Sequence, residues 1–353
     1  MSDQAVEKKG KSTRDPAAYA AIDLGTNNCR LLIAQATATG FHVVDGYSRI
    51  VRLGEGVASS NRLNAEAMGR TLNALRVCAQ KINHWGARRI RCIATEACRR
   101  ADNGIAFLER VTRETGLPFE IVTPELEAHL TLQGCLPLFS TAVPHTLLFD
   151  IGGGSTEIVW VGPNDGKTAV SHAMMSFPMG VVTLAESYGN GQIDAHQFEQ
   201  ICARVMDILE PFDQRNTIQS AIRSGQVQLI GTSGTVTTLA AMTLDLARYD
   251  RSKVDGLEIS FDTVERLIAD ISTMSMDARR NIACIGPERA DLMVMGCAIL
   301  KAICTKWPVG RLRAADRGIR DGLLLEMIDK DRRSGALAEI LINSPPINSY
   351  ARG

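Results

Sequence analysis

The sequence lacks an excess of either charge, because Lys and Arg together number 39 and Asp and Glu also number 39 in 353 residues. This balance excludes a uniformly basic coat for nucleic acid and an extended acidic tail. No apolar run reaches the length that crosses a bilayer, and the polar first 16 residues lack the apolar core of a secretory signal. We therefore expect a protein that binds neither nucleic acid nor membrane.

Close pairs of cysteines or of histidines that could bind a metal ion are also missing. The nine cysteines lie singly, mostly inside apolar runs, and none forms a Cys-x-x-Cys pair, which favours reduced thiols and a cytoplasmic location. The six histidines include no His-Glu-x-x-His sequence, which argues against a histidine-based metal centre. Lysine is scarce, at nine residues against 30 arginines. That imbalance favours oxyanion ligands, but GC-rich codon usage explains it equally well.

Length and patterning predict two α/β domains, because 353 residues exceed the usual size of one hydrophobic core. We expect the last helix of the second domain to be able to pack on the first. The expected boundaries are a disordered arm at 1–17, an N-terminal domain at 18–140, a C-terminal domain at 141–330 and a peripheral tail at 331–353.

Each domain is expected to open with antiparallel strands rather than with a helix. Apolar runs at 19–23, 29–35 and 41–47 are separated only by turns, which predicts a β-meander. In the second domain, apolar strands at 146–150 and 156–161 flank a glycine turn. Helical spacing and shorter apolar runs predict the remaining elements, which are helices at 68–82, 105–115, 196–212, 236–246, 262–274 and 288–304, and strands at 90–94, 119–122 and 227–230.

The two domains begin with the same pattern, which indicates an internal duplication. Asp23-Leu-Gly-Thr-Asn-Asn-Cys-Arg-Leu-Leu-Ile33 aligns position by position with Asp150-Ile-Gly-Gly-Gly-Ser-Thr-Glu-Ile-Val-Trp160. In both, an apolar strand ends in Asp, a Gly follows two residues later, and small polar residues lead into a second strand. A single Gly-Gly-Gly is most often only a tight turn, whereas two equivalent hairpins indicate two related domains with a cleft between them.

The chemistry of these turns suits phosphate, because glycine lets backbone N–H groups converge on an anion and small polar side chains add uncharged donors. A third loop at 231–235 follows a strand and opens a helix, so it either binds an anion or merely caps the helix. The predicted phosphate-binding residues are Gly25, Thr26, Asn27, Asn28, Gly152, Gly153, Gly154, Ser155, Gly231, Thr232, Ser233, Gly234 and Thr235.

Each hairpin also places a carboxylate at the end of its first strand, Asp23 in the first domain and Asp150 in the second. Mg²⁺ prefers oxygen ligands and keeps part of its hydration shell, so such a residue can hold it directly or through water. We therefore predict Mg²⁺ or another divalent cation as the cofactor.

Several motifs together resemble those of the exopolyphosphatase and guanosine pentaphosphate phosphohydrolase family, within the actin, sugar-kinase and heat-shock-chaperone superfamily. They include AIDLGTNNCRLLIA, ATEACRRADNG, FDIGGGSTEIV, GTSGTVTTLAA and ADRGIRDGLL, and they run in family order from about residue 20 to 328. The resemblance implies two actin-like, ribonuclease-H-like domains with the active site in the cleft between them. The additional helical domain of long members has no counterpart here, so we expect an open cleft and shorter or smaller substrates.

The resemblance assigns the catalytic pair. The family places its general base just before an Ala in this segment, which corresponds to Glu127, although the residues that precede it in the family, Gly and Glu, are Pro124 and Leu126 here. Arg99 matches the family's arginine in Thr-x-x-x-Arg and is expected to clamp the terminal phosphate. Spacing alone would make Glu127 one more acidic residue near a helix start and Arg99 a solvated side chain.

The resemblance also implies the metal ligands. Asp150 and Glu157 match the family's acidic pair around the glycine loop, and Asp23 is the first domain's counterpart. We expect Asp150 to bind the ion and Glu157 to bind either the ion or the reacting water. Without the resemblance, Glu157 would equally be an exposed strand residue.

The expected reaction is removal of the terminal phosphate of inorganic polyphosphate, of guanosine pentaphosphate, or of both, by Mg-assisted attack of a water that Glu127 activates. One alternative is a kinase of the same superfamily, and another is a regulator that binds a nucleotide or alarmone without turnover. The altered residues at 124–126 are the reason to consider the regulator. The resemblance is also compatible with a homodimer, which the residues themselves do not indicate.

Overall fold

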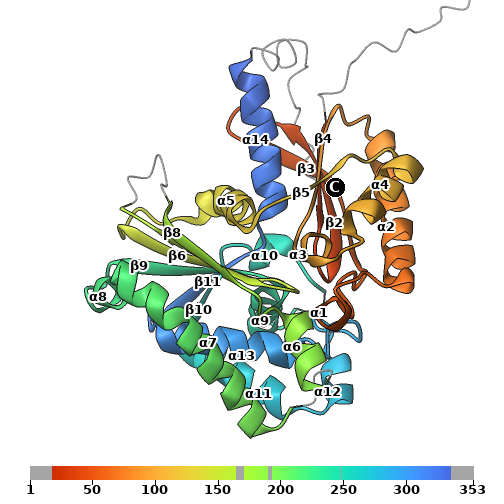
Figure 1. Cartoon of the computed structure of the whole chain (residues 1–353). Helices are drawn as coiled ribbons and strands as arrows, with labels where there is room; N and C mark the ends of the chain where they lie inside the picture. Colours follow the sequence, from red (N-terminus) through yellow and green to blue (C-terminus); the bar gives the residue numbers. More distant parts are fainter. Residues whose placement is uncertain (1–17, 164–170, 190–192, 247, 335–353) are drawn as a thin grey trace, which may run out of the picture.

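The computed structural model describes residues 18–163, 171–189, 193–246 and 248–334. The arm expected at 1–17 and the tail from residue 335 onward lie outside these described residues. Two β-sheets stand at a steep angle to each other, and each has helices on its outer face (Figure 1). None of the helices in the described part combines the length and the apolar character needed to cross a membrane.

The first sheet has five strands in the order β3-β2-β1-β4-β5. The first three strands in the chain form the expected antiparallel meander, and the other two continue the sheet parallel to β1. Helices α2 (Ala65–His84) and α4 (Gly104–Thr115) cover its outer face with a shared apolar core. The strands are β1 (Ala18–Leu24), β2 (Asn28–Ala36), β3 (Phe41–Ile50), β4 (Arg89–Ala94) and β5 (Phe119–Ile121).

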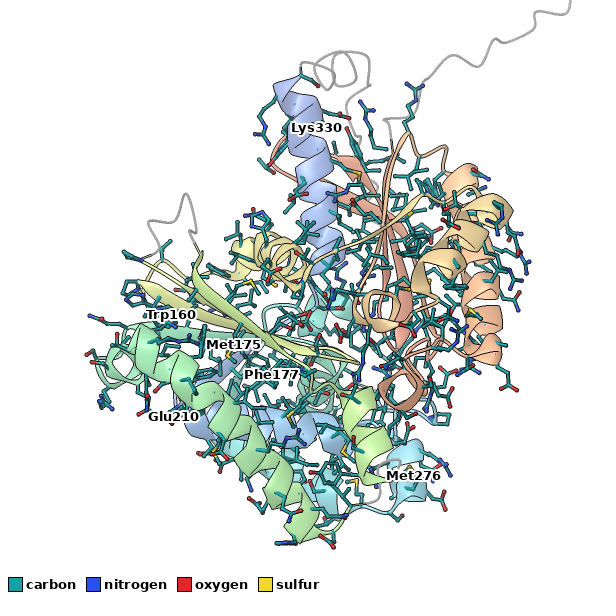
Figure 2. All side chains as sticks on the ribbon, in the orientation of Figure 1. Trp160, Met175, Phe177, Glu210, Met276 and Lys330 are labelled. Carbon is teal, nitrogen blue, oxygen red and sulfur yellow. The ribbon has the colours of Figure 1, made fainter. Side chains whose placement is uncertain are left out.

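The second sheet repeats this plan with six strands in the order β10-β11-β9-β6-β7-β8. Its first three strands in the chain are again an antiparallel meander, and β9 and β11 extend it in parallel. Trp160 and Phe177 lie in the core between this sheet and helix α7 (Figure 2). The strands are β6 (His145–Ile151), β7 (Thr156–Val161), β8 (Ser171–Phe177), β9 (Val227–Thr232), β10 (Glu258–Ser260) and β11 (Arg311–Ala315).

The remaining helices lie mostly around the second sheet. They are α1 (Val57–Ser60), α3 (Glu96–Arg100), the 3-10 turn η1 (Leu136–Leu138), α6 (Val181–Tyr188), α7 (Ala195–Asn216), α8 (Ile218–Arg223), α9 (Gly234–Thr243), α10 (Arg251–Val254), α11 (Phe261–Thr273), α12 (Met276–Arg280) and α13 (Met293–Lys306). The helix expected from residue 288 begins only at Met293. In the segment before Met293, two backbone carbonyl groups accept hydrogen bonds from arginine side chains: Arg52 donates to Glu288 O, and Arg279 donates to Ala290 O.

A helix pair fills the space between the two sheets (Figure 1). Helix α14 (Ile319–Arg333) follows the second sheet in the chain but packs on the inner face of the first sheet. Helix α5 (Pro124–Cys135) lies beside it and packs on the second sheet through Ala128 and Leu132. The backbones touch closely, because a Cβ atom at Gly134 would lie 2.2 Å from the carbonyl oxygen of Gly318. The chain passes between the domains at both places, so this pair fixes how the domains meet.

Candidate active site in the interdomain cleft

The two glycine hairpins meet tip to tip in the cleft. A Cβ atom at Gly153 would lie 3.0 Å from the Cβ atom of Thr26 and 3.1 Å from the backbone nitrogen of Asn27. Real Cβ atoms rarely approach so closely, so only glycine lets the second hairpin reach the first without displacing it. The side-chain oxygen Oδ1 of Asn27 is buried at this contact without a hydrogen-bond partner, which leaves it available to a ligand.

Hydrogen bonds from helix α6 hold the carbonyl groups of the second loop. The carbonyl oxygens of Gly152 and Gly153 accept hydrogen bonds from the backbone of residues 181–183, and Thr183 Oγ1 donates to Gly154 O. In a trans peptide, the N–H group that follows a carbonyl points the opposite way, so the N–H groups of residues 153–155 point away from α6. Gly180 allows this packing, because a Cβ atom there would lie 2.4 Å from the backbone of Gly153.

The first hairpin is anchored in the same way. The carbonyl oxygen of Thr26 accepts from Gly54 N, and that of Asn27 accepts from the backbone nitrogens of Val51 and Arg52. In both predicted phosphate turns, the first glycine amide closes the turn by donating to Asn28 O or Ser155 O, and the carbonyls between them are held by a neighbouring segment. This arrangement is typical of backbone anion sites.

Strand register places a second charged residue opposite each strand-end aspartate. In β6–β7, Asp150 pairs with Glu157, and in β1–β2, Asp23 pairs with Arg30. Glu157 is 3% exposed, and its Oε1 accepts hydrogen bonds from Ser155 Oγ at 2.6 Å and from Ser176 Oγ at 2.8 Å. The predicted acidic pair of the second domain is thus assembled, and a serine on β8 helps to orient it.

Glu127 and Arg99 lie together, as their predicted roles require. Glu127 stands in the first turn of α5 and is buried, with 8% of its surface exposed. Arg99 lies on α3 and donates from Nη1 to Val122 O at 2.6 Å and to Glu127 Oε2 at 3.4 Å. Its Nη2 donates to Glu96 Oε2 at 2.7 Å. The guanidinium group is therefore held among acceptors on the first-domain side of the cleft.

The clustering of carboxylates perturbs their protonation. Burial raises the pKa of Asp150 to about 8, with a further contribution from Glu157, while Arg30 lowers it. Burial also raises the pKa of Glu127 well above its usual value, and the charges of Glu157 and Asp23 raise it further. The pKa of Glu157 is raised by burial and lowered by its two serine hydrogen bonds. Perturbed carboxyl groups gathered in a cleft are a common mark of an active site.

The donor set of the second hairpin fits Mg²⁺ as a partial site. Among the described residues, no group of three or more His, Cys, Asp and Glu side chains could hold a metal ion by itself. Mg²⁺ usually takes one or two carboxylates and completes its shell with water and substrate phosphate oxygens. Asp150 and Glu157 provide such a pair, and a cation would relieve their mutual repulsion. Burial raises the pKa of Asp23, and the nearby Arg30 and Arg320 partly offset this. Its role as a third ligand stays a prediction.

A second group of positive charges lies beyond the two aspartates. We call it the arginine cavity, and its lining has three arginines and three aspartates: Arg30, Arg317, Arg320, Asp23, Asp150 and Asp316, together with Thr232, Ser233, Thr237 and three neighbouring residues at 315–319. Burial lowers the pKa of Arg320, and the nearby Arg30 lowers it further. The same two causes lower the pKa of Arg289, whose Nη1 reaches Thr238 Oγ1 at 3.4 Å. Guanidinium groups that repel one another are stabilised by an anion between them.

The third predicted phosphate loop is only partly directed into this cavity. Thr232 and Ser233 line it, although Thr232 Oγ1 donates to Arg317 O and Ser233 Oγ caps α9 by accepting from Val236 N. Gly231 and Thr235 are directed into the core, since a Cβ atom at Gly231 would meet the ring of Phe149 and Thr235 packs against α13. The helix-cap alternative is therefore realised at Ser233, and the phosphate role of this loop stays a prediction.

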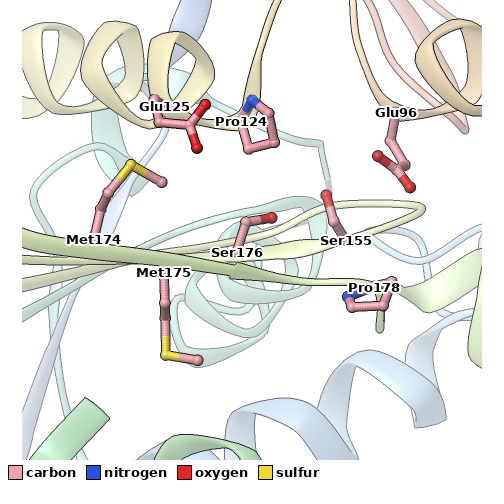
Figure 3. A pocket seen from close by; sticks show the side chains of 8 residues that line it. All are labelled: Glu96, Pro124, Glu125, Ser155, Met174, Met175, Ser176 and Pro178. Atoms are coloured by element: carbon pink, nitrogen blue, oxygen red, sulfur yellow. The ribbon is translucent and has the colours of Figure 1, made fainter.

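An acidic cavity of about 410 Å³ opens on the other side of the hairpin contact. Figure 3 shows Glu96, Pro124 and Glu125 from the first domain facing Ser155 and Ser176 of the second across this space. Met174 and Pro178 add apolar surface to the second-domain wall. This acidic cavity is the opening next to Arg99 and the serines that hold Glu157.

The two departures from the family pattern before Glu127 do not disturb the site. Pro124 occupies the first position of α5, where the missing N–H group costs nothing, and Thr123 caps the helix by accepting from Leu126 N. Leu126 packs against the apolar cluster of α14 rather than into the cleft. Pro124 and Leu126 are therefore compatible with a regular start of α5, which places Glu127 in the cleft.

Sequence reasoning missed several residues that the fold brings to the site. Arg30 carried a usable signal, because it occupies the position in the first repeat that Glu157 occupies in the second. Ser176 and Thr183 flank the segment at 177–180. They could be assigned to the site only once β8 and α6 were placed against the glycine loop. Arg320 lies in the ADRGIRDGLL stretch, where the sequence shows no sign of its approach to Asp23.

Known proteins share this architecture over nearly the whole chain. A Ppx/GppA family member from Aquifex aeolicus is 26% identical, with a TM-score of 0.73 over 89% of this chain and 98% of that one. An exopolyphosphatase from Cytophaga hutchinsonii is 23% identical, with a TM-score of 0.80 and the same coverages. An exopolyphosphatase-like protein is 29% identical, with a TM-score of 0.78 over 90% of this chain and 98% of that one.

These similarities confirm the predicted fold class, which is α/β with two actin-like domains. They also agree with the sequence comparison, in which the model of the Ppx/GppA phosphatase family matches residues 32–331. That span includes most of both domains and begins just after the turn of the first hairpin. The chain belongs to the Ppx/GppA phosphatase family.

Proposed function

We propose that the protein hydrolyses the terminal phosphoanhydride bond of a linear phosphate chain in the interdomain cleft. The observation that carries the proposal is the meeting of Glu127, Arg99 and Glu157 beside two hairpins whose turn carbonyls accept hydrogen bonds from neighbouring segments. Phosphoryl transfer needs positioning and charge stabilisation more than covalent chemistry, and this arrangement supplies both.

Glu127 is the proposed base. Burial of its carboxylate, together with the surrounding negative charge, raises its pKa, which increases its affinity for a proton from water. Arg99 is close enough to stabilise the developing charge on the transferred phosphoryl group. As the proton moves to Glu127, the water oxygen forms its bond to the terminal phosphorus and the bond to the bridging oxygen breaks.

The second domain is proposed to hold the phosphate and its cation. The amide groups of residues 153–155 bind phosphoryl oxygens, and Asp150 and Glu157 would hold Mg²⁺. When bound, the ion neutralises charge on the phosphate chain. Ser155 and Ser176 keep the Glu157 carboxylate in one orientation while it does so.

The arginine cavity suits the part of the substrate beyond the scissile bond. Arg30 and Arg320 line this cavity, and Arg30 lowers the pKa of both Arg320 and Arg289, so an oligophosphate or a nucleotide pyrophosphate near Arg30 would offset that repulsion. The relatives described as exopolyphosphatases make inorganic polyphosphate one proposed substrate, and the GppA branch of the family name makes guanosine pentaphosphate the other.

The test is release of orthophosphate without any acceptor. Purified protein is incubated with Mg²⁺ and with long polyphosphate, tripolyphosphate or guanosine pentaphosphate in parallel. We expect orthophosphate from at least one of the three. Release that depends on an added hydroxyl acceptor would indicate a kinase instead, and tight guanosine pentaphosphate binding without release under varied metals would indicate a regulator.

Glu127→Gln tests the proposed base directly. We expect the variant to fold and bind orthophosphate normally but to lose about a thousandfold in turnover, because general-base catalysis contributes on this scale. In the wild type, the rate should rise with pH through the raised pKa of Glu127 and then level, since only the unprotonated carboxylate accepts a proton. Wild-type rates in Glu127→Gln would refute the mechanism, and the pH-dependent limb should be absent from its residual activity.

A further inference from the structure

Arg99 is engaged by a carboxylate of its own helix. Glu96 and Arg99 lie three residues apart on the short helix α3, and Arg99 Nη2 donates to Glu96 Oε2 at 2.7 Å. Residues at this spacing on a helix share one face, so Glu96 is always within reach of the guanidinium group. A carboxylate takes the same planar hydrogen bonds from arginine that a phosphate takes.

Glu96 also lies against the glycine loop of the opposite domain. A Cβ atom at Gly154 would lie 2.8 Å from Cγ of Glu96, so the Glu96 side chain stands between Arg99 and the loop. In Figure 3 the Glu96 carboxylate and the Ser155 hydroxyl reach toward the same space of the acidic cavity. A phosphoryl group gripped by both Arg99 and the loop amides would need this space.

We propose that Glu96 acts as an internal competitor that occupies Arg99 until a phosphoryl group displaces it. Glu96 is then a positioning residue that acts through Arg99. It weakens the grip on phosphate, and it reclaims Arg99 as the product leaves. The kinetic part of this proposal rests on the proposed phosphohydrolase function, whereas the effect on phosphate binding does not.

The contacts of Arg99 indicate that Glu96 competes with phosphate for the guanidinium group and is not needed to hold that group in place. Val122 O and Glu127 Oε2 already accept from Nη1, so the guanidinium group has an orientation that does not depend on Glu96. Glu125 provides a second carboxylate on the same wall, and no hydrogen bond joins it to Arg99 among the contacts described. Glu125 therefore separates a general effect of negative charge from specific occupation of Arg99.

The experiment measures binding of orthophosphate by calorimetry at fixed Mg²⁺, with Glu96→Gln, Glu125→Gln and wild type compared. Glu96→Gln removes the competing charge and keeps the side-chain shape, so we expect about tenfold tighter binding. Glu125→Gln removes the same charge from the same cavity and should tighten binding less than about twofold. The shorter carboxylate of Glu96→Asp should give an intermediate affinity, and thermal melts check that all three variants fold.

Steady-state kinetics supply the second readout. With a phosphoanhydride substrate, Glu96→Gln should lower KM and strengthen inhibition by orthophosphate without raising kcat, because the product then leaves more slowly. Orthophosphate binding in Glu96→Gln that is unchanged or weaker would overturn the proposal, and so would equal tightening in Glu125→Gln. A wild type that releases no orthophosphate from any substrate would refute the proposed function but leave the binding result to decide the role of Glu96.

Discussion

In the first domain Arg30 stands opposite Asp23 in the β1–β2 ladder, whereas in the second domain Glu157 stands opposite Asp150 in the β6–β7 ladder. The two hairpins otherwise share their strand, turn and anchoring pattern. Burial raises the pKa of both aspartates; Arg30 opposes this rise at each, whereas Glu157 adds to it at Asp150. A single register position therefore makes one hairpin nearly neutral and the other doubly acidic.

This difference shows how a duplicated scaffold divides the work of one site. In the proposed mechanism, the acidic hairpin binds Mg²⁺ together with the transferred phosphoryl group. The arginine of the balanced hairpin lines the arginine cavity, which is the proposed place for the rest of the phosphate chain. The proposed catalytic pair comes from the first domain, because Arg99 and Glu127 lie together on α3 and α5.

Removing the charge of Glu157 should affect mainly turnover, whereas removing the charge of Arg30 should affect mainly substrate binding. We expect Glu157→Gln to lower kcat by about a hundredfold or more, because it weakens charge stabilisation at the transferred group. Arg30→Gln should act mainly on KM, raising it about tenfold, because its partner is the non-reacting part of the substrate. Steady-state kinetics on one substrate decide the point, and equal loss of the same parameter in both variants would contradict the division.

The two turns should also differ in their tolerance of a side chain. Gly153→Ala pushes a methyl group against Thr26 and Asn27, and parting the two turns should lower kcat/KM about tenfold. Gly25→Ala meets only Asn28 O at an ordinary 3.6 Å, so we expect activity within about twofold of wild type. If the two alanine variants lose activity equally, the close approach of the turns is not what positions the phosphate.

The smallest effect concerns stability without metal. A carboxyl pKa raised to about 8 in the folded state means that the folded protein holds a proton that the unfolded chain releases near pH 4. Stability from this group is therefore complete at low pH and is lost as the pH rises toward 8. Asp150→Asn removes that loss, so its melting temperature at pH 8.5 should exceed that of the metal-free wild type by about 3–5 °C.

Asp23→Asn is the matched control for this comparison. Arg30 and Arg320 offset the burial of Asp23, so the gain in melting temperature should be smaller than in Asp150→Asn. Saturating Mg²⁺ should erase the advantage of Asp150→Asn, because only the wild type gains stability from the ion at that carboxylate. A larger gain in Asp23→Asn than in Asp150→Asn would reverse the assignment of the acidic hairpin.

The order of apolar and polar residues in short segments predicted those strands and turns that depend mainly on neighbouring residues. Apolar runs located the three strands of the first meander and two of the three in the second, but not β8, and the Asp-x-Gly repeat showed that the two hairpins are equivalent. It did not predict β11, a five-residue strand whose parallel partner β9 lies some eighty residues earlier. Pairing at that separation is decided by the whole sheet, which no short window of sequence contains.

The site was predictable to the extent that its residues lie in the repeat or match a family motif. Glu127 could be chosen only through the resemblance, because a glutamate near a helix start is ordinary. Its burial depends on α5 packing between the two sheets, which the sequence does not show. Likewise, the contact of Glu96 with Gly154 joins residues of different domains and appears only when the hairpins meet.

In the proposed reaction, water attacks the terminal phosphorus of a phosphate chain that is held between the two hairpins. Single-turnover hydrolysis of tripolyphosphate or guanosine pentaphosphate in ¹⁸O-water, followed by mass spectrometry of both products, tests it most directly. Our account predicts one ¹⁸O atom in the released orthophosphate and none in the shortened product. Label in the shortened product would show attack at the penultimate phosphorus and would contradict the account.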